Sequence, residues 1–196
     1  MNGLLAWLLR QLGFSVTLVS GRVHRKDGSY GPEFDHMALL VRLDQQEYLV
    51  DVGFGDSARV PLPMSGEVAT DISSSYRIIA GDSADVFLFQ KRAGEEWVTH
   101  FLFTKTPRTL EDFQEMNREQ QTNPKSPFTQ KRICSIATPN GRITIAGESL
   151  IETVGADKTK TPIASADELH ELLRQRFGIS KEDEGISTQE KNGQRP

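Results

Sequence analysis

Apolar residues along the chain recur first at helical spacing and then at strand spacing. Residues 2–12 show a helical repeat, and Gly13 follows at a position typical of a helix end, so we expect a helix here. Positions 16–23 are rich in β-branched residues, which predicts a strand. The apolar stripe of the helix consists of Leu4, Leu5, Leu8, Leu9 and Leu12.

The middle of the chain has the pattern of a β-rich domain. Residues 36–43 and 48–54 flank a polar turn and predict a β-hairpin, and their nearly continuous apolar runs indicate that both faces are covered. Further strands are expected at 76–80, 85–91 and 97–103. This spacing is typical of a barrel or a strongly curved sheet.

The last third mixes helices and strands. Thr109 and Asp112 predict a capped helix that ends near residue 123, and strands are expected at 132–137, 142–146 and 149–154. Ser165 predicts the start of a last helix, and Gly178 its end. Its buried face should consist of Leu169, Leu172, Leu173 and Phe177. The fold class is therefore α+β.

Charge and composition restrict the possible partners. The 196 residues carry a formal net charge of -4, which does not suggest binding to nucleic acid or to an anionic membrane surface. The longest apolar run, 3–9, is too short to cross a bilayer. The first ten residues lack the positive n-region and the small-residue cleavage site of a secretory signal, so we expect a cytoplasmic protein. Cys134 is the single cysteine and the four histidines are scattered, so no metal site is expected.

His36 and Asp51 are the candidates for chemistry, because they lie on the two predicted arms of the hairpin. Paired strands are about 4.8 Å apart, so the carboxylate can reach the imidazole and hold its tautomer while the ring activates a nucleophile. A lone histidine–aspartate pair is more often structural, and that alternative stays open on these residues alone. No serine lies in a nucleophile-elbow motif, which leaves a serine hydrolase unsupported.

Four further segments, together with the strand of His36, carry a resemblance to the arylamine N-acetyltransferases. It extends to about residue 180, and the spacing of fifteen positions between His36 and Asp51 also fits that family. The segments are Asn2-Gly3-Leu4-Leu5, Val50-Asp51-Val52-Gly53-Phe54-Gly55, Ser126-Pro127-Phe128, and Cys134-Ser135 with Thr138-Pro139-Asn140-Gly141-Arg142.

The resemblance implies transfer of acetyl from acetyl-CoA to arylamines, arylhydroxylamines or hydrazines through a papain-like Cys-His-Asp triad, in xenobiotic metabolism. His36 would be the base and Asp51 its orienter. Phe54 would contact the arylamine, and Gly53 and Gly55 would lie in a tight turn near acetyl-CoA, open to a ligand at the backbone amides. The alternative for this segment is a strand-ending turn with a core phenylalanine.

By the same resemblance, residues 1–14 would be a remnant of an N-terminal helical domain, 15–107 a β-barrel domain, 108–180 an α/β lid and 181–196 a disordered tail. The family's cysteine motif, Arg-Gly-Gly-x-Cys-x-Glu-x-Asn, aligns its asparagine with Asn2, so its cysteine would precede Met1. We therefore expect a truncated chain that is inactive alone. The alternative is a non-catalytic remnant that binds CoA or a partner, or self-associates through surface left uncovered.

The remaining candidates are expected to be structural. Cys134 resembles a small buried hydrophobe, and Asp35 should point to solvent. His24, His100 and His170 have the pattern of surface or edge residues, and Trp7 and Trp97 that of packing residues.

Overall fold

The computed structural model describes residues 1–155 and 157–180, so the predicted tail 181–196 lies outside the described residues. The described residues form two compact units, the first from Met1 to Ser126 and the second beginning at Pro127. The helix after Thr109 lies in the first unit, whereas the lid expected from the resemblance, 108–180, includes it.

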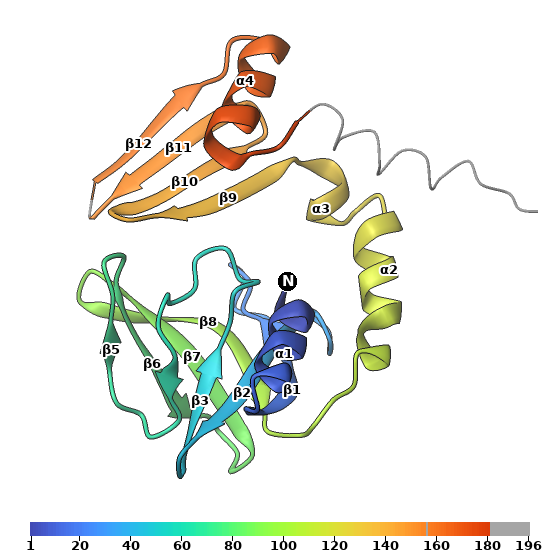
Figure 1. Ribbon diagram of the computed structural model, residues 1–196, viewed down its shortest axis with the longest axis vertical. Coiled ribbons are helices and arrows are strands. Elements are labelled where there is room, and N and C mark those ends of the chain that lie inside the picture. Colours follow the sequence, from blue (N-terminus) through green and yellow to red (C-terminus); the bar gives the residue numbers. More distant parts are fainter. Residues whose placement is uncertain (156, 181–196) are drawn as a thin grey trace, which may run out of the picture. The chain divides into compact units, whose positions relative to one another are not determined.

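The first unit is built on an eight-stranded antiparallel sheet with the order β4-β3-β2-β1-β8-β7-β6-β5. The strands are β1 (Ser15–Val23), β2 (His36–Leu43), β3 (Gln46–Val50), β4 (Leu62–Pro63), β5 (Ala69–Thr70), β6 (Ser75–Ala80), β7 (Val86–Ala93) and β8 (Glu96–Thr104). The first strand in this order, β4, also contacts β6 near the opposite edge. The sheet therefore curls into a nearly closed barrel, as predicted (Figure 1).

Two hydrophobic cores cover the two faces of β1 and β2. The interior core contains Val19 and Leu40 with the rings of Phe89, Phe101 and Phe103. The outer core contains Leu18 and Leu39, with Ala6 of the helix α1 (Asn2–Gln11), which lies across the outside of these strands (Figure 1). Neighbouring residues on a strand point to opposite faces, so the continuous apolar runs reflect burial on both sides.

α1 buries only one of its faces. Asn2 and Ala6 are buried, and Leu5 and Leu9 pack against the outer core. Trp7, expected to pack, is 61% exposed because it lies on the opposite face of the helix. The other exposed apolar residues of this segment are Met1, Leu4, Leu8 and Leu12.

The second arm of the hairpin ends earlier than predicted. β3 stops at Val50, whereas the apolar pattern predicted a strand to residue 54. The backbone amides of Gly53 and Phe54 donate to the Asp51 carboxylate at 2.8 and 3.1 Å instead of to a neighbouring strand. The carboxylate therefore turns the chain out of the sheet.

The predicted helix after Thr109 starts with a short turn. The 3₁₀ helix η1 (Glu111–Phe113) leads into α2 (Gln114–Thr122). The Thr109 amide donates to Asp112 Oδ2 at 2.8 Å, which is the returning half of a capping box. Phe113 is buried, whereas Leu110 is 50% exposed.

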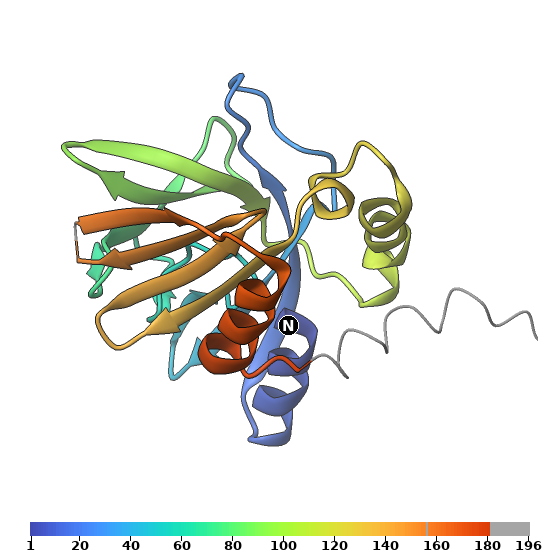
Figure 2. The same ribbon diagram turned by 90° about the horizontal axis from the view of Figure 1, so that it is seen from above.

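The second unit is a four-stranded antiparallel meander with one main helix. α3 (Pro127–Gln130) is followed by β9 (Ile133–Thr138), β10 (Gly141–Ala146), β11 (Ser149–Val154) and β12 (Asp157–Pro162). α4 (Ala166–Phe177) contacts β9 and buries Leu173 (Figure 2). Ser165 caps α4 by accepting from the Glu168 amide, and Gly178 ends it at φ +68°, as predicted. β12 was not predicted because it is wholly polar and exposed.

Candidate active site

His36 occupies a glycine-lined position at the start of β2. Its register partner on β1 is Gly21, where a Cβ atom would lie 3.1 Å from the Phe101 ring and 3.4 Å from His36 Cβ. Any larger residue there would press on the imidazole. The ring centroids of Phe101 and Phe54 lie 4.9 and 5.3 Å from the imidazole, so His36 has aromatic walls.

Asp51 directly follows β3 and holds the imidazole. Its Oδ2 lies 2.8 Å from His36 Nε2, and its side chain is only 3% exposed. Burial opposes ionisation of this carboxyl, but hydrogen bonds from His36, Asn2 and Gly53 and the charge of His36 outweigh it, so the pKa of Asp51 lies below its ordinary value of 3.8. The carboxylate is therefore ionised at neutral pH.

The role of Asn2 in this site was not evident from the sequence pattern. Its Nδ2 donates to Asp51 Oδ1 at 2.8 Å and to the Met37 carbonyl, and its Oδ1 accepts from the Val52 amide at 2.9 Å. A Cβ atom at Gly53 would lie 2.9 Å from Asn2 Nδ2, so the glycine makes this contact possible. A single polar residue on the otherwise apolar buried face of α1 was the available signal.

The hydrogen bond to Asp51 assigns the two ring nitrogens of His36 different roles. A buried, ionised carboxylate stabilises the tautomer in which Nε2 carries the proton. Within the described residues, Nδ1 makes no hydrogen bond. Nδ1 thus presents a lone pair that can take a proton from a thiol or hydroxyl, and Asp51 stabilises the imidazolium that results.

Gly53 and Gly55 differ in what their positions require. Neither has a positive φ, so the backbone conformation at these two positions does not require glycine. The Gly53 amide is used by Asp51, whereas a Cβ at Gly55 would meet open space. A contact between these residues and acetyl-CoA stays a prediction, and at Gly53 it would have to use a group other than the amide.

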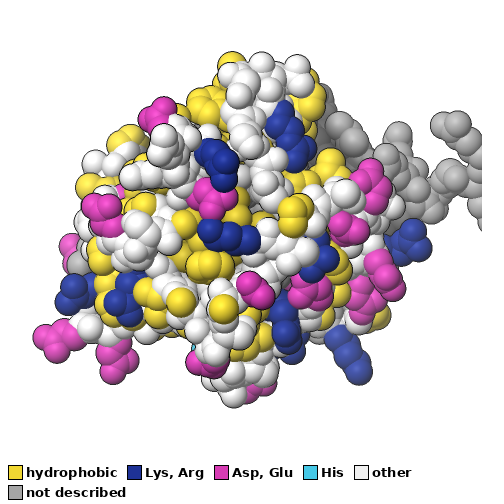
Figure 3. Space-filling view, turned by 90° about the horizontal axis from the view of Figure 1, so that it is seen from below, with side chains coloured by type: hydrophobic (Ala, Val, Ile, Leu, Met, Phe, Trp, Pro, Cys, Tyr) yellow, Lys and Arg dark blue, Asp and Glu magenta, His cyan; other side chains and the backbone are white. Residues whose placement is uncertain are grey.

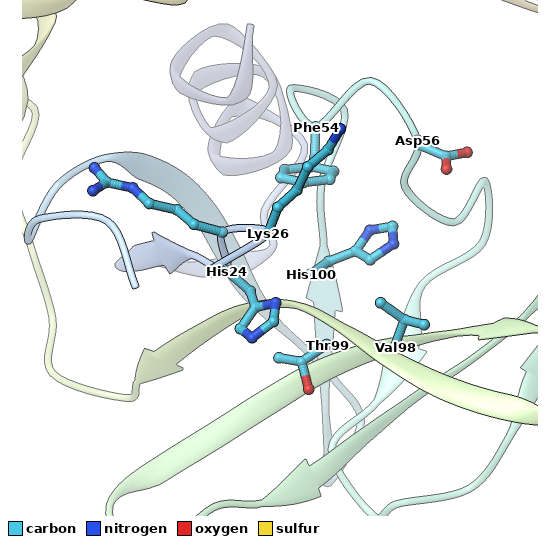
Figure 4. A pocket seen from close by; sticks show the side chains of 8 residues that line it. His24, Lys26, Phe54, Asp56, Val98, Thr99 and His100 are labelled. Carbon is cyan, nitrogen blue, oxygen red and sulfur yellow. The ribbon is translucent and has the colours of Figure 1, made fainter. Parts of the chain in front are cut away.

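Phe54 links His36 to a hollow that no sequence pattern predicted. Its ring centroid lies 5.3 Å from that of His36 and 5.2 Å from that of His100. The hollow has a volume of ≈ 390 Å³ (Figure 4). Its lining consists of His24, Arg25, Lys26, Phe54, Asp56, Val98, Thr99 and His100.

His100 is less exposed than a surface histidine. It lies on β8 between Phe54 and Phe89, and its Nδ1 is buried without a hydrogen bond in the described part of the chain. Burial is the main cause that lowers the pKa of His100 below its ordinary value of 6.5. The ring is therefore neutral at neutral pH and forms a flat wall of the hollow.

Asp35 does not point freely to solvent as expected. Its Oδ1 and its carbonyl both accept from Gln120 Nε2 of α2 at 3.0 Å. The carboxylate also fills the space beside Gly31, where a Cβ would lie 2.1 Å from Oδ2. This carboxylate joins α2 to the segment that leads into His36.

The described residues contain no candidate metal site and no candidate membrane-spanning helix. Residues 1–155 and 157–180 contain no group of three or more His, Cys, Asp or Glu side chains placed to hold a metal ion. No helix within these ranges is long and apolar enough to span a membrane. The face in Figure 3 intersperses basic and acidic side chains with apolar ones.

Comparison with known proteins assigns this site to a family. The N-acetyltransferase family profile matches residues 1–186. Arylamine N-acetyltransferase 2 of Mus musculus is 30% identical over 208 residues, which cover 93% of this chain and 71% of the relative. The chain belongs to the arylamine N-acetyltransferase family.

Solved arylamine N-acetyltransferases share the fold. The Mycobacterium marinum enzyme in complex with CoA is 28% identical with a TM-score of 0.83, covering 91% of this chain and 67% of that one. A Bacillus cereus enzyme, described with a unique Cys-His-Glu catalytic triad, is 24% identical with a TM-score of 0.81 and coverages of 91% and 71%. The barrel-like sheet and mixed α+β architecture are thus those of arylamine N-acetyltransferases.

Cys134, the single cysteine of the sequence, has the properties of a structural residue. It lies on β9 in the second unit and is half-buried. Burial raises the pKa of its thiol above the ordinary value of 9.0, so at neutral pH it is protonated. A protonated thiol is a poor nucleophile.

Replacing Asn2→Ala should destabilise the site and the fold together. Loss of a buried hydrogen bond to a carboxylate should lower the free energy of unfolding by about 2–3 kcal/mol. The pKa of Asp51 should also rise relative to the wild type, because one group that lowers it is lost. Urea denaturation and an NMR titration of the Asp51 carboxyl measure both effects. The matched control Asn117→Ala, on exposed α2, should cost less than about 0.5 kcal/mol. Equal effects of the two substitutions would contradict this role of Asn2.

His100 should make stability depend on pH below about 6.5. Its pKa is lowered in the folded state, so the unfolded chain takes up the proton first, and stability falls as pH decreases from 6.5 through the lowered pKa. His100→Phe keeps an aromatic wall and removes this dependence. Denaturation of both proteins between pH 5 and 8 should show the wild type losing stability relative to the variant at the acidic end. A difference that does not change with pH would contradict the assignment.

Proposed function

We propose that this chain supplies the general base and an aromatic wall of an arylamine N-acetyltransferase active site. The base is His36 with its partner Asp51, together called the base couple below, and the wall is Phe54. In this proposal acetyl passes from acetyl-CoA to a cysteine and then to an arylamine, arylhydroxylamine or hydrazine. The single observation that carries the proposal is the 2.8 Å contact between His36 Nε2 and Asp51 Oδ2, which leaves Nδ1 for the nucleophile. The family membership of the chain supports it.

The proposed roles of His36 and Asp51 follow from the neutral imidazole of the one and the ionised carboxylate of the other. His36 Nδ1 accepts the thiol proton, and the ionised Asp51 stabilises the imidazolium. The thiolate then attacks the thioester carbonyl of acetyl-CoA, and CoA leaves as the thiol. In the second half-reaction the amine attacks the acetyl-cysteine, and the same imidazole takes the proton from the amine.

Other parts of the site have proposed places in the same reaction. Phe54 is the wall for the arylamine, since its ring lies against His36. Gly53 and Gly55 lie next to it, and we place the acetyl-CoA thioester near them. We further propose a cytoplasmic setting, because the reaction needs acetyl-CoA and a reduced thiol. A role in xenobiotic metabolism is proposed from the family membership of the chain.

The 196-residue chain should not complete this reaction by itself. Its one cysteine, Cys134, has a raised pKa and lies outside the family's cysteine motif. With acetyl-CoA and 4-methoxyaniline, the purified chain should give no acetylated amine above the buffer rate and no acetyl adduct by intact mass. Cys134→Ser should give the same background. Turnover above the buffer rate that disappears in His36→Gln would refute the predicted inactivity.

The role of His36 is tested in a protein that carries the nucleophile. If the reading frame upstream of Met1 encodes Arg-Gly-Gly-x-Cys-x-Glu, the longer protein should form an acetyl-enzyme, and His36→Gln should slow that step by about 10²–10⁴-fold. Lys125→Ala, an exposed residue, is the control and should leave the rate unchanged. A His36→Gln enzyme with the wild-type rate of acetylation contradicts the assigned base.

A second candidate function is a non-catalytic chain that binds CoA or a partner, or self-associates. The observation that favours self-association is the exposed apolar face of α1, on which Leu4 is 75% and Trp7 61% exposed. We therefore expect a concentration-dependent dimer in size exclusion with light scattering, which Leu4→Gln with Leu8→Gln converts to monomer. Leu43→Gln, at an exposed apolar residue at the end of β2, should leave the dimer intact. A monomeric wild type at all concentrations contradicts this candidate.

A further inference from the structure

Asp35 connects His36 to a helix that is distant in the sequence. The Nε2 amide group of Gln120, on α2, donates at 3.0 Å to the carbonyl oxygen of Asp35 and, also at 3.0 Å, to its carboxylate Oδ1. Asp35 directly precedes His36, so this carbonyl belongs to the peptide group that joins the two residues. A single side chain of α2 therefore fixes the peptide from which His36 extends.

Strand pairing secures His36 on one side only. The pairing of β1 with β2 ends at Gly21 and His36, so Asp35 lies just outside it. The end of a strand ladder opens more easily than its interior. Gln120 supplies its two hydrogen bonds where the ladder stops, and it thereby continues the hold on the chain beyond the last strand pair.

The second residue before His36 has an unusual backbone conformation. Phe34 has a φ of +65°, a left-handed conformation that bulky residues rarely adopt and that persists only where the surroundings impose it. Its amide donates to the buried Ser20 hydroxyl at 2.7 Å, and its ring meets the Phe113 ring edge-on at a centroid distance of 5.3 Å. If the contact from Gln120 were lost, this segment could relax toward an extended conformation and carry His36 with it.

The face of α2 that carries Gln120 is turned toward the rest of the first unit. Gln120 and Met116 are half-buried and lie four positions apart, on one side of the helix, whereas the other residues of Gln114–Thr122 are exposed. Phe113, directly before α2, is buried. Gln120 is thus the polar residue of an otherwise apolar face, and packing of that face determines where it meets Asp35.

The Asp35 carboxylate takes part in this contact and not in one with the imidazole. Its Oδ1 accepts from Gln120, and its Oδ2 fills the space beside Gly31, where a Cβ atom would lie 2.1 Å away. Within the described residues, the imidazole of His36 hydrogen-bonds to Asp51 and not to Asp35. Asp35 therefore acts on His36 through the backbone.

We propose that Gln120 is a positioning residue for His36: it holds Asp35 and the peptide that follows, so that the imidazole keeps its contact with Asp51. The role of His36 as the base rests on the proposed function, whereas the hold on its imidazole does not. Because Gln120 belongs to α2, the placement of this helix and the orientation of the imidazole depend on each other.

The test follows the Nε2 proton of His36 in the 196-residue chain. This proton lies in the 2.8 Å contact with Asp51, so its exchange with water, measured by NMR, reports how often the imidazole leaves the carboxylate. Gln120→Glu keeps the size of the side chain, removes both donated hydrogen bonds and places a second carboxylate beside Asp35. The proton should then exchange roughly three- to tenfold faster, as expected for the loss of one or two hydrogen bonds.

Two control variants separate this effect from a change in charge or in general stability. Gln121→Glu makes the same substitution at the next residue, which is exposed and donates to Asn117 of the same helix. Ser74→Ala removes a hydrogen bond elsewhere in the first unit, the one from the Ser74 hydroxyl to the Arg92 carbonyl at 2.8 Å. Both variants should leave the exchange of the His36 proton at the wild-type rate.

Exchanging the donor and the acceptor provides a rescue. In the double variant Asp35→Asn with Gln120→Glu, the amide at position 35 can donate to the carboxylate at position 120, and the two like charges no longer face each other. The exchange rate of the His36 proton should therefore return toward that of the wild type. Damage to the packing of α2 alone would not be repaired by this second substitution.

Four results would overturn the proposal. They are an unchanged exchange rate in Gln120→Glu; an equal acceleration in Ser74→Ala or in Gln121→Glu; no recovery in the double variant; and a wild-type proton that exchanges too fast to observe, since the imidazole would then not be held at all. No measurement depends on acetyl transfer, so an inactive chain would bear on the proposed function alone.

Discussion

The buried carboxylate of Asp51 is the group on which the rest of the site depends. An ionised carboxylate with 3% exposure is stable only if protein donors replace its water. Those donors come from three parts of the first unit: the Asn2 amide from α1, the imidazole of His36 from β2, and the backbone amides of Gly53 and Phe54 after β3. Satisfying this one charge therefore joins a helix, a strand and a turn at one point.

The packing of β1 and β2 brings those donors to the same place. Both strands are covered by the interior core on one side and by α1 on the other, so α1 cannot shift without uncovering Leu18 and Leu39. A strand register that slipped by one residue would also exchange the two faces. Burial thus supplies most of the stabilisation, at roughly 1.5–3 kcal/mol for each large apolar side chain, and the hydrogen bonds to Asp51 select the register and orientation.

The aromatic residues extend the site away from the base couple. His36, Phe54, His100 and Phe89 form a series in which each ring centroid lies within 5.5 Å of the next. Phe54 therefore belongs to the interior core and to the wall of the hollow at once. The same ring that helps to hold the barrel together determines how an aromatic ligand can approach His36, which joins the stability of the fold to the selectivity of the site.

The sequence by itself determined the helices and strands whose apolar residues recur regularly, and it identified His36 and Asp51 as the pair of candidate catalytic residues. The helix at the N-terminus, the principal strands of the barrel, the capped α4 and the fold class followed from local patterns, because apolar spacing and capping residues act within a few positions. The motif around Asp51 identified His36 and Asp51 as a pair and indicated the family. The end of β3 was misplaced because the apolar pattern continues through Phe54, while the competing donors to Asp51 are visible only in three dimensions.

Only the tertiary structure decided which residues distant in the sequence position His36 and Asp51. Asn2 reaches Asp51 across 49 positions, and Gln120 reaches Asp35 across 85, so no local pattern could indicate these hydrogen bonds. His24 and His100 looked like separate surface residues until the pairing of β1 with β8 brought their segments together. Apolar periodicity reports which face of an element is buried, but the contacts that a polar side chain makes across the fold depend on how whole elements pack.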